Sequence, residues 1–255
     1  MGHDSLCVGG VSYLNARPLL FTLPQLLPEA GIVVDFPSRL ADGLCDGRFD
    51  VALIPSIEYL RQPGLRIASD AVIACDGPVR SVKLYGRVPI ERVDTLALDE
   101  GSRTSAALAQ ILLRERFGLR PCLLSLPLAS MPIDSPADAV VVIGDRGMSA
   151  PEEDLAFVWD LGEEWSRWTG LPFVFALWAA RPHVQEERID RALAAARNEG
   201  LTRLPEIARL ASPEVGIPES ECLSYLRDNL EFRLGPRQQE GLERFYQLAK
   251  QHGLA

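Results

Sequence analysis

Short apolar runs alternate with helix-like periodicity over the first two-thirds of the chain. The runs at 49–54 and 139–143 are short and bounded by turn residues, as expected of buried strands. After Asp99, apolar residues recur at helical spacing as far as Gly118, which suits a C-terminal cap. Ser38 is the predicted N-cap of a helix through Leu44. Further strands are predicted at residues 6–9, 33–36, 65–73, 79–85, 96–98, 122–126 and 155–159. This alternation predicts an α/β fold with a largely parallel sheet and helices on its faces.

From residue 184 onward the pattern becomes helical. Helices are predicted at residues 186–201, 204–211, 219–230 and 237–252. No repeat and no Ser/Gly-rich linker marks a domain boundary, so a division into two domains would have to fall in extended crossings. The two candidate crossings are residues 79–86 and 173–180, since both are apolar and β-prone.

Composition narrows the class of protein. The chain is 47% hydrophobic and 24% charged, which is ordinary for a globular protein. A net charge of -9 without a basic stripe argues against a nucleic-acid partner. Five scattered cysteines without a C-x-x-C pair indicate free thiols in a reducing compartment. No window approaches the roughly 18 apolar residues of a membrane span, and the N-terminus lacks a signal-peptide pattern, so we expect a cytoplasmic protein.

Polar side chains cluster where the first predicted strand ends. Ser12, Tyr13 and Asn15 follow that strand, and Pro18 is placed to open a helix. Because ligands of open α/β sheets bind at the carboxyl ends of strands, these side chains are candidates for a binding site. The alternative is a simple turn, since Asn tolerates left-handed backbone and Pro fixes φ.

A second polar cluster precedes the best helical segment. Ser102, Arg103 and Thr104 would bring two hydroxyls, a guanidinium and free backbone N–H groups to one point. That combination predicts an anion site at a helix N-terminus, and a carboxylate is favoured because no Gly-rich loop with a Lys supports phosphate binding. The alternative is an ordinary serine cap.

A third candidate follows the apolar run 139–143. Gly144 allows close backbone approach, and Asp145 could accept a hydrogen bond from a hydroxyl or carry a proton. The alternative is an Asp that caps the next turn. Ser56 and Ser81 also lie next to predicted strands and could donate to the same cleft.

Several catalytic classes are poorly supported. Histidine occurs only at His3, His183 and His252, away from these clusters. No G-x-S-x-G, H-E-x-x-H or G-x-G-x-x-G pattern is present. Ser-His-Asp hydrolysis, zinc chemistry and dinucleotide binding are therefore disfavoured, and we expect neither a metal nor a cofactor.

Six segments in order resemble the chorismate dehydratases, which begin the futalosine route to menaquinone. They are residues 10–19, 51–56, 77–82, 102–105, 143–145 and 169–176. The resemblance implies a two-lobed fold like the type II periplasmic binding proteins, with ligand between the lobes and a helical C-terminal tail packed on the first lobe. The expected division is lobe 1 from residues 1–85 and 178–255, and lobe 2 from residues 86–177.

The resemblance also implies an activity, the elimination of water from chorismate to give 3-[(1-carboxyvinyl)oxy]benzoate. The substrate's own enolpyruvyl carboxylate would remove the proton while Asn15 positions it, and Asp145 is a second catalytic candidate. Nucleic acid, membrane or an obligate protein partner is not expected. The remaining candidates, all for substrate binding, are Ser12, Tyr13, Ser56, Ser81, Ser102, Arg103, Thr104 and Gly144.

Two other functions stay open. The sibling enzyme that makes dihydroxynaphthoate in the same pathway has a similar fold, but its opening motif differs from Tyr13-Leu14-Asn15. A non-enzymatic binding protein for a small carboxylate would need export, and no export signal is recognised.

Overall fold

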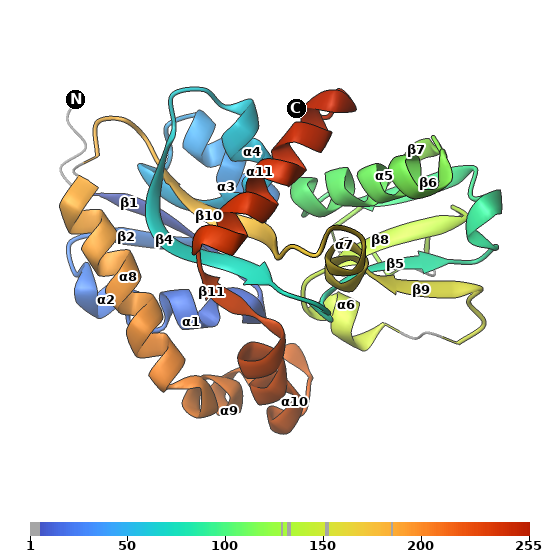
Figure 1. Cartoon of the computed structure of the whole chain (residues 1–255). Coiled ribbons are helices and arrows are strands. Elements are labelled where there is room, and N and C mark those ends of the chain that lie inside the picture. The colour runs from blue at the N-terminus through green and yellow to red at the C-terminus, as the bar shows by residue number, and fades with distance from the viewer. Residues whose placement is uncertain (1–5, 129, 132–133, 151–152, 185) are drawn as a thin grey trace.

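The chain forms two β-sheets, each covered by helices (Figure 1). The computed structural model describes residues 6–128, 130–131, 134–150, 153–184 and 186–255. The six-stranded sheet has the order β11-β4-β10-β3-β1-β2 and the five-stranded sheet the order β7-β6-β8-β5-β9. Strands of the larger sheet are β1 (Cys7–Val11), β2 (Gly31–Asp35), β3 (Val51–Pro55), β4 (Arg66–Cys75), β10 (Phe173–Ala180) and β11 (Glu231–Arg233). Strands of the smaller sheet are β5 (Val82–Gly86), β6 (Thr95–Asp99), β7 (Cys122–Leu126), β8 (Ala139–Ile143) and β9 (Phe157–Asp160).

Helices connect and cover these strands. The long ones are α3 (Pro37–Cys45), α5 (Arg103–Phe117), α7 (Leu161–Thr169), α8 (Glu186–Thr202), α9 (Leu204–Val215) and α11 (Pro236–Gln251). Shorter ones are α1 (Arg17–Leu20), α2 (Leu23–Leu26), α4 (Ser56–Arg61), α6 (Asp145–Ser149), α10 (Glu219–Ser224), the 3-10 turns η1 (Leu14–Ala16) and η2 (Ile90–Arg92), and a π-helical turn, η4 (Tyr225–Asn229).

The sheets are mixed, not largely parallel as the alternation predicted. In the larger sheet β1 is parallel to β2 and β3, but β10 is antiparallel to β3 and β4. In the smaller sheet β6 is parallel to β7 and β8, but β5 is antiparallel to β8 and β9. The antiparallel strand β5 is the first that the chain forms after it enters the smaller sheet. The antiparallel strand β10 is the first that it forms after it returns to the larger sheet.

The chain passes between the sheets twice, at residues 76–81 and 170–172. The segments predicted as crossings, 79–86 and 173–180, instead contain β5 and β10, which lie inside the sheets. Their apolar character comes from burial, since all eight residues of β10 are buried. The strand β5 pairs with β8 in the smaller sheet. The expected boundary between residues 85 and 86 would instead divide this strand between the two lobes.

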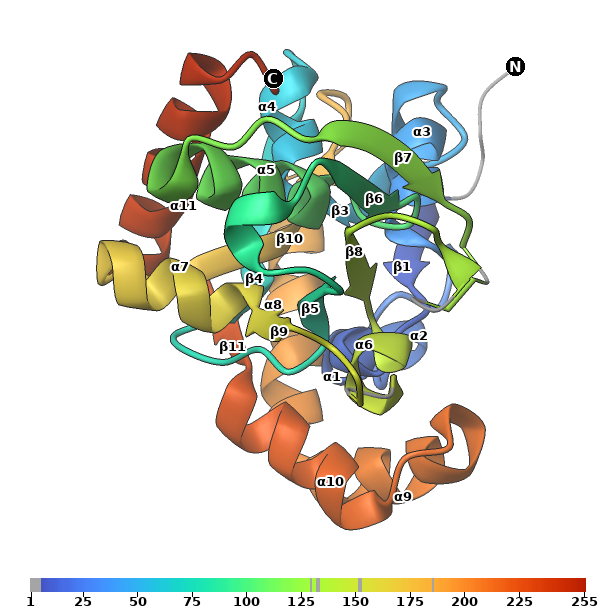
Figure 2. The same cartoon turned by 90° about the vertical axis from the view of Figure 1, so that its right-hand side faces the viewer.

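The C-terminal segment packs on the larger lobe, which is the lobe built on the six-stranded sheet, as the resemblance implied. Helices α8, α9 and α10 and the strand β11 return along that lobe, and α9 and α10 extend below it in both views (Figures 1 and 2). Helix α11 then contacts β10, α4 and α5, so it lies against both lobes. Phe245 of α11 packs edge-on against Phe173 and Trp165.

Local signals explain several elements and their exceptions. Gly118 has φ 69° and caps α5 as predicted. Ser38 is not an N-cap, because α3 begins at Pro37 after Phe36, and the Ser38 N–H donates to the Gly101 carbonyl at 3.2 Å. Proline at the first helical position starts this helix instead.

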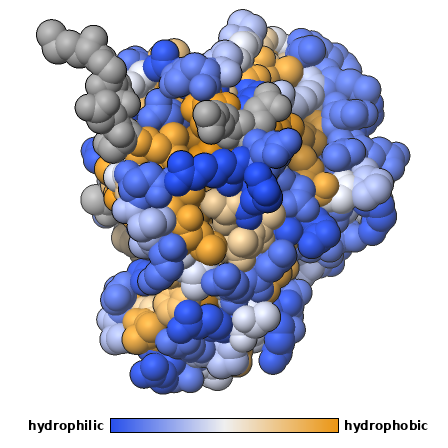
Figure 3. All heavy atoms as spheres, turned by 90° about the vertical axis from the view of Figure 1, so that its left-hand side faces the viewer, coloured by the Kyte–Doolittle hydropathy of each residue, from blue (hydrophilic) through white to orange (hydrophobic). Residues whose placement is uncertain are grey.

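The surface is mixed. On the face that carries β2 and α8, hydrophilic side chains surround apolar ones (Figure 3). Val33 and Val34 of the edge strand β2 are 48% and 53% exposed. Among the described helices, none has the length and hydropathy needed to cross a membrane.

Candidate active site

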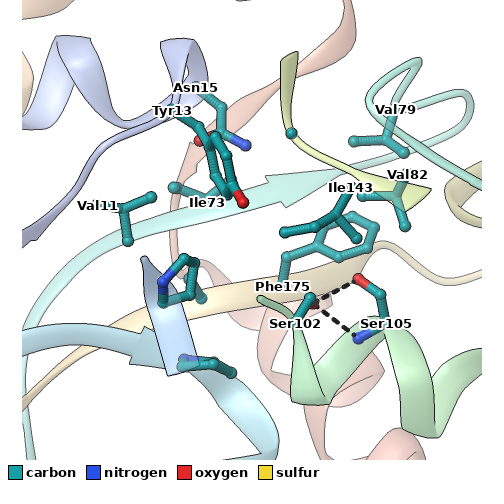
Figure 4. A pocket seen from close by; sticks show the side chains of 14 residues that line it. Val11, Tyr13, Asn15, Ile73, Val79, Val82, Ser102, Ser105, Ile143 and Phe175 are labelled. Carbon is teal, nitrogen blue, oxygen red and sulfur yellow. Dashed lines mark hydrogen bonds between the residues drawn. The ribbon is translucent and has the colours of Figure 1, made fainter. Parts of the chain in front are cut away.

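A pocket lies between the two lobes and encloses about 450 Å³ of space, including its mouth. Tyr13 and Asn15 enter it from the larger lobe, and Ser102 and Ser105 face them from the start of α5 (Figure 4). Most of its wall is apolar. The other lining residues are Val11, Pro37, Pro55, Ile73, Val79, Val82, Ile143, Gly144, Phe175 and Ala176. A concave apolar wall with a few polar groups is typical of a small-molecule site.

Tyr13 spans the pocket from the loop after β1. Its side chain is only 7% exposed, and its ring lies against Gly144, where an added Cβ would be 2.6 Å from the Tyr13 ring carbons. Burial and the nearby Asp99 carboxylate raise the pKa of Tyr13 above its usual range, so the hydroxyl stays protonated at neutral pH. The Arg146 guanidinium lies near this hydroxyl and opposes the rise in its pKa, but no described group meets the Oη at the distance and angle of a full hydrogen bond.

Asn15 lies two residues further along the chain, in η1. Its Oδ1 is buried and has no hydrogen-bond partner among the described residues. The described non-glycine residues with positive φ are Arg80 and Asp154, so Asn15 is not in the left-handed region. The turn interpretation of Asn15 therefore loses its physical basis, because this backbone does not need asparagine.

The first turn of α5 forms the opposite wall. Ser102 is the N-cap of α5, and its Oγ accepts from the Ser105 N–H at 3.2 Å and lies 2.8 Å from Ser105 Oγ. Both side chains line the pocket. The positive end of a 15-residue helix thus faces the cavity with two hydroxyls attached.

A buried ion pair braces this wall. The Asp99 carboxylate is fully buried and pairs with the Arg146 guanidinium at 2.6 Å. It also accepts from the N–H groups of Gly101 at 2.9 Å and Ile143 at 3.2 Å. Burial raises the pKa of Asp99, while Arg146 and these N–H donors oppose the rise. Asp99 therefore holds the start of α5 and the turn at Gly144 in one fixed arrangement.

Other predicted site residues join the lobes. Arg103 pairs with Asp42 at 2.8 Å and with Glu58 at 3.2 Å. The Ile57 N–H donates to Thr104 Oγ1 at 3.2 Å. Ser56 Oγ donates to the Val174 carbonyl at 2.7 Å. The contacts of Arg103 and Thr104 fasten α5 to α3 and α4 across the lobes, and the Ser56 contact joins α4 to β10 within the larger lobe.

Asp145 also links the lobes. Its Oδ1 accepts from the Leu14 N–H at 3.1 Å, so it holds the loop that carries Asn15. Burial raises the pKa of Asp145, and the Leu14 N–H and the Arg17 charge oppose the rise. The carboxylate does not belong to the pocket lining.

The structure thus divides the predicted site residues into two groups. Tyr13, Asn15, Ser102 and Gly144 line one pocket. Ser12, whose N–H donates to the Asp35 carbonyl, lies outside its lining. Ser56, Ser81, Arg103, Thr104 and Asp145 lie outside it as well and act on its frame.

Sequence reasoning missed Asp99, Arg146, Ser105, Tyr225 and the apolar wall. Asp99 ends the strand β6, just as Asp145 follows the strand β8. An acidic residue at the carboxyl end of a strand is a local sequence signal from which Asp99 could have been predicted. Tyr225 carries no comparable local signal, since it comes from the C-terminal segment.

Ser102→Ala is expected to weaken binding of a carboxylate ligand, because the Ser102 hydroxyl donates to Ser105 Oγ and so holds the Ser105 hydroxyl as the donor to the ligand. Losing a hydrogen bond to a charged group costs roughly 1.5–3 kcal/mol, or about ten- to hundredfold in affinity. Loss of the cap should also lower stability by about 1 kcal/mol. Titration calorimetry with the benzoate product checks the first effect and urea unfolding the second. Ser166→Ala, outside the pocket lining, is the control, and equal affinities in the two variants would contradict a role for Ser102.

Solved structures with this fold define the class of protein. A protein from Archaeoglobus fulgidus matches with a TM-score of 0.83 at 17% identity, covering 100% of both chains. The periplasmic aliphatic sulphonate binding protein of Escherichia coli matches with a TM-score of 0.62 at 14% identity, over 100% of this chain and 89% of that one. This chain is thus an α/β protein of the two-lobed periplasmic-binding-protein type, with a pocket between its lobes.

Sequence comparison identifies the family. Residues 6–251 match the family model described as Menaquinone biosynthesis, and the chain belongs to that family. A chorismate dehydratase from Thermus thermophilus is 32% identical, with 91% of each chain covered. Another, from Campylobacter jejuni, is 25% identical over 97% of this chain and 99% of its own.

Proposed function

We propose that this protein is a chorismate dehydratase, a hydro-lyase that converts chorismate to 3-[(1-carboxyvinyl)oxy]benzoate. Two relatives over nearly the full chain carry that name, and the family matched is one of menaquinone biosynthesis. The pocket supplies the setting that the reaction needs, a mostly apolar cavity with a few fixed polar groups.

The reaction removes the proton at C3 and the hydroxyl at C4 of chorismate. The enolpyruvyl carboxylate takes the C3 proton, and the electron pair of the broken C3–H bond is delocalised through the adjacent double bond onto the ring carboxylate. Those electrons then form the C3–C4 double bond as the C4–O bond breaks, and the leaving oxygen takes up the proton so that it departs as water. The ring becomes aromatic, which drives the elimination, and no electron acceptor is consumed.

The protein must orient the substrate and stabilise charge where it develops. The start of α5, with Ser102 and Ser105, is suited to hold a substrate carboxylate because of its hydroxyls and helix dipole. Neutral Tyr13 is suited to donate a hydrogen bond. No pocket-lining residue of the described chain carries a carboxylate or imidazole, which favours the enolpyruvyl carboxylate of the substrate as the base.

One observation carries this assignment of the pocket. Tyr13 Oη and Asn15 Oδ1 are buried polar atoms that find no hydrogen-bond partner in the described part of the protein. An unsatisfied buried polar atom costs about 1–3 kcal/mol, so two of them at one cavity indicate groups kept for a ligand. A donor and an acceptor side by side suit a hydroxylated carboxylate such as chorismate.

One experiment distinguishes chorismate dehydration from the activity of the sibling enzyme and from binding without turnover. The purified protein is incubated, with a chelator and without added cofactor, with chorismate or with the cyclic futalosine derivative. Mass spectrometry should show loss of one water from chorismate and no change in the other compound. Turnover of the futalosine derivative alone would assign the sibling activity, and binding of chorismate without conversion would indicate a binding protein.

A further inference from the structure

The C-terminal segment comes close behind the pocket wall at Tyr225, the first residue of the π-helical turn η4. Tyr225 is completely buried, and its hydroxyl donates to Ser81 Oγ at 2.7 Å. The other side chain hydrogen-bonded to the Tyr225 oxygen is Asn15. Residues that lie 66 positions or more apart along the chain thus form one chain of hydrogen bonds: Asn15, Tyr225 and Ser81.

The direction of these bonds fixes the Asn15 amide. A phenol has one proton, and that of Tyr225 is given to Ser81, so the Tyr225 oxygen accepts from the Asn15 N–H. The Asn15 Oδ1 is consequently the end without a partner in the described residues. An amide held in this way offers the ligand an acceptor, suited to a hydroxyl or a protonated carboxyl group.

The rest of η4 is fastened to the same place. Asn229 Nδ2 donates to the Pro78 carbonyl at 2.9 Å, in the crossing that leads to Ser81. Val79 and Arg80 in that crossing donate their N–H groups to Asp160 at 2.9 Å and 2.5 Å. These contacts fix the Ser81 end of the hydrogen-bond chain, and π-helical turns of this kind are frequent at functional sites.

We propose that Tyr225 is a positioning residue, which orients the Asn15 amide so that its oxygen accepts a hydrogen bond from the substrate. Tyr225 itself does not line the pocket, so it acts through Asn15 and Ser81. This inference rests on the proposed function, since Asn15 is taken to contact chorismate.

The test is Tyr225→Phe, which keeps the ring and removes the hydroxyl. With chorismate as substrate, kcat should fall about 10- to 100-fold because the amide is free to rotate, while KM stays close to that of the wild type. Tyr246→Phe is the matched control, because Tyr246 also donates a buried hydroxyl to a carbonyl, that of Ser56, at 2.7 Å. The control should lower Tm as much as Tyr225→Phe and leave kcat unchanged.

A double variant separates positioning from packing. In an Asn15→Ala background, Tyr225→Phe should lower the residual kcat no further, because the group that it orients is gone. Independent losses in the double variant would overturn the inference, and so would a Tyr225→Phe enzyme with wild-type kcat. If the wild-type protein itself fails to dehydrate chorismate, the proposed function fails, and this inference fails with it.

Discussion

Asn15→Ala is expected to lower kcat for chorismate by about a hundred- to a thousandfold, the effect of removing one preorganised hydrogen-bonding group from a reaction site. The folded state should be little affected, because η1 does not require asparagine at this position and Asn15 is not part of the apolar core. Thermal unfolding and turnover measured on the same preparation check both statements.

The control for Asn15→Ala is Asn198→Ala, an exposed position on α8 outside the pocket lining. Asn15→Asp is the second variant, since it keeps the shape and adds a negative charge beside a dianionic substrate. Like-charge repulsion should then raise KM as well as lower kcat. An Asn15→Ala protein that is unstable but active would contradict a catalytic role for Asn15.

Gly144→Ala is expected to remove both stability and activity. Gly144 has φ 69° and ψ -154°, a region that is essentially restricted to glycine. A Cβ there would also lie 2.6 Å from the Tyr13 ring. Strain and overpacking together should cost roughly 2–6 kcal/mol of unfolding free energy. Moving Tyr13 would also distort the wall of the pocket, so product affinity should fall; urea unfolding and calorimetry measure the two effects.

Gly118→Ala is the matched control for Gly144→Ala. Gly118 also has φ 69°, but nothing lies within 4 Å of its added Cβ. Its cost should be limited to the left-handed backbone, about 1–2 kcal/mol, with turnover unchanged. In Gly144→Ala, a second change of Tyr13→Ala should recover part of the stability but none of the activity. Equal losses in the Gly144 and Gly118 variants would contradict the close packing of Tyr13 on Gly144.

Sequence patterns predicted the fold where local signals suffice. The strands at 122–126 and 139–143 and the helix that ends at Gly118 have the predicted bounds or nearly so. Burial misled the prediction at β5 and β10, since an apolar β-prone run is the same whether it crosses between lobes or lies inside a sheet. The strand β11 was not predicted, because its three residues fall between the predicted helices at 219–230 and 237–252 and give too short a pattern to recognise.

The candidate site shows the same limit. Tyr13, Asn15, Ser102 and Gly144 were found because polar or small residues at strand ends are a local signal. The partners of these residues come from distant parts of the chain. Arg146, in the helix α6, pairs with Asp99 at the end of β6. Tyr225 donates a hydrogen bond to Ser81, which lies 144 positions away along the chain. Such partners follow from tertiary packing, which spacing along one sequence does not encode.

Proton magnetic resonance of chorismate during incubation with the wild-type protein tests the central claim most directly. The ring signals of the diene should be replaced by aromatic ring signals while the vinyl signals of the enolpyruvyl group persist, and Asn15→Ala should show the same change far more slowly. Chorismate that stays unchanged, or a product that has lost its vinyl signals as pyruvate is released, would contradict the account.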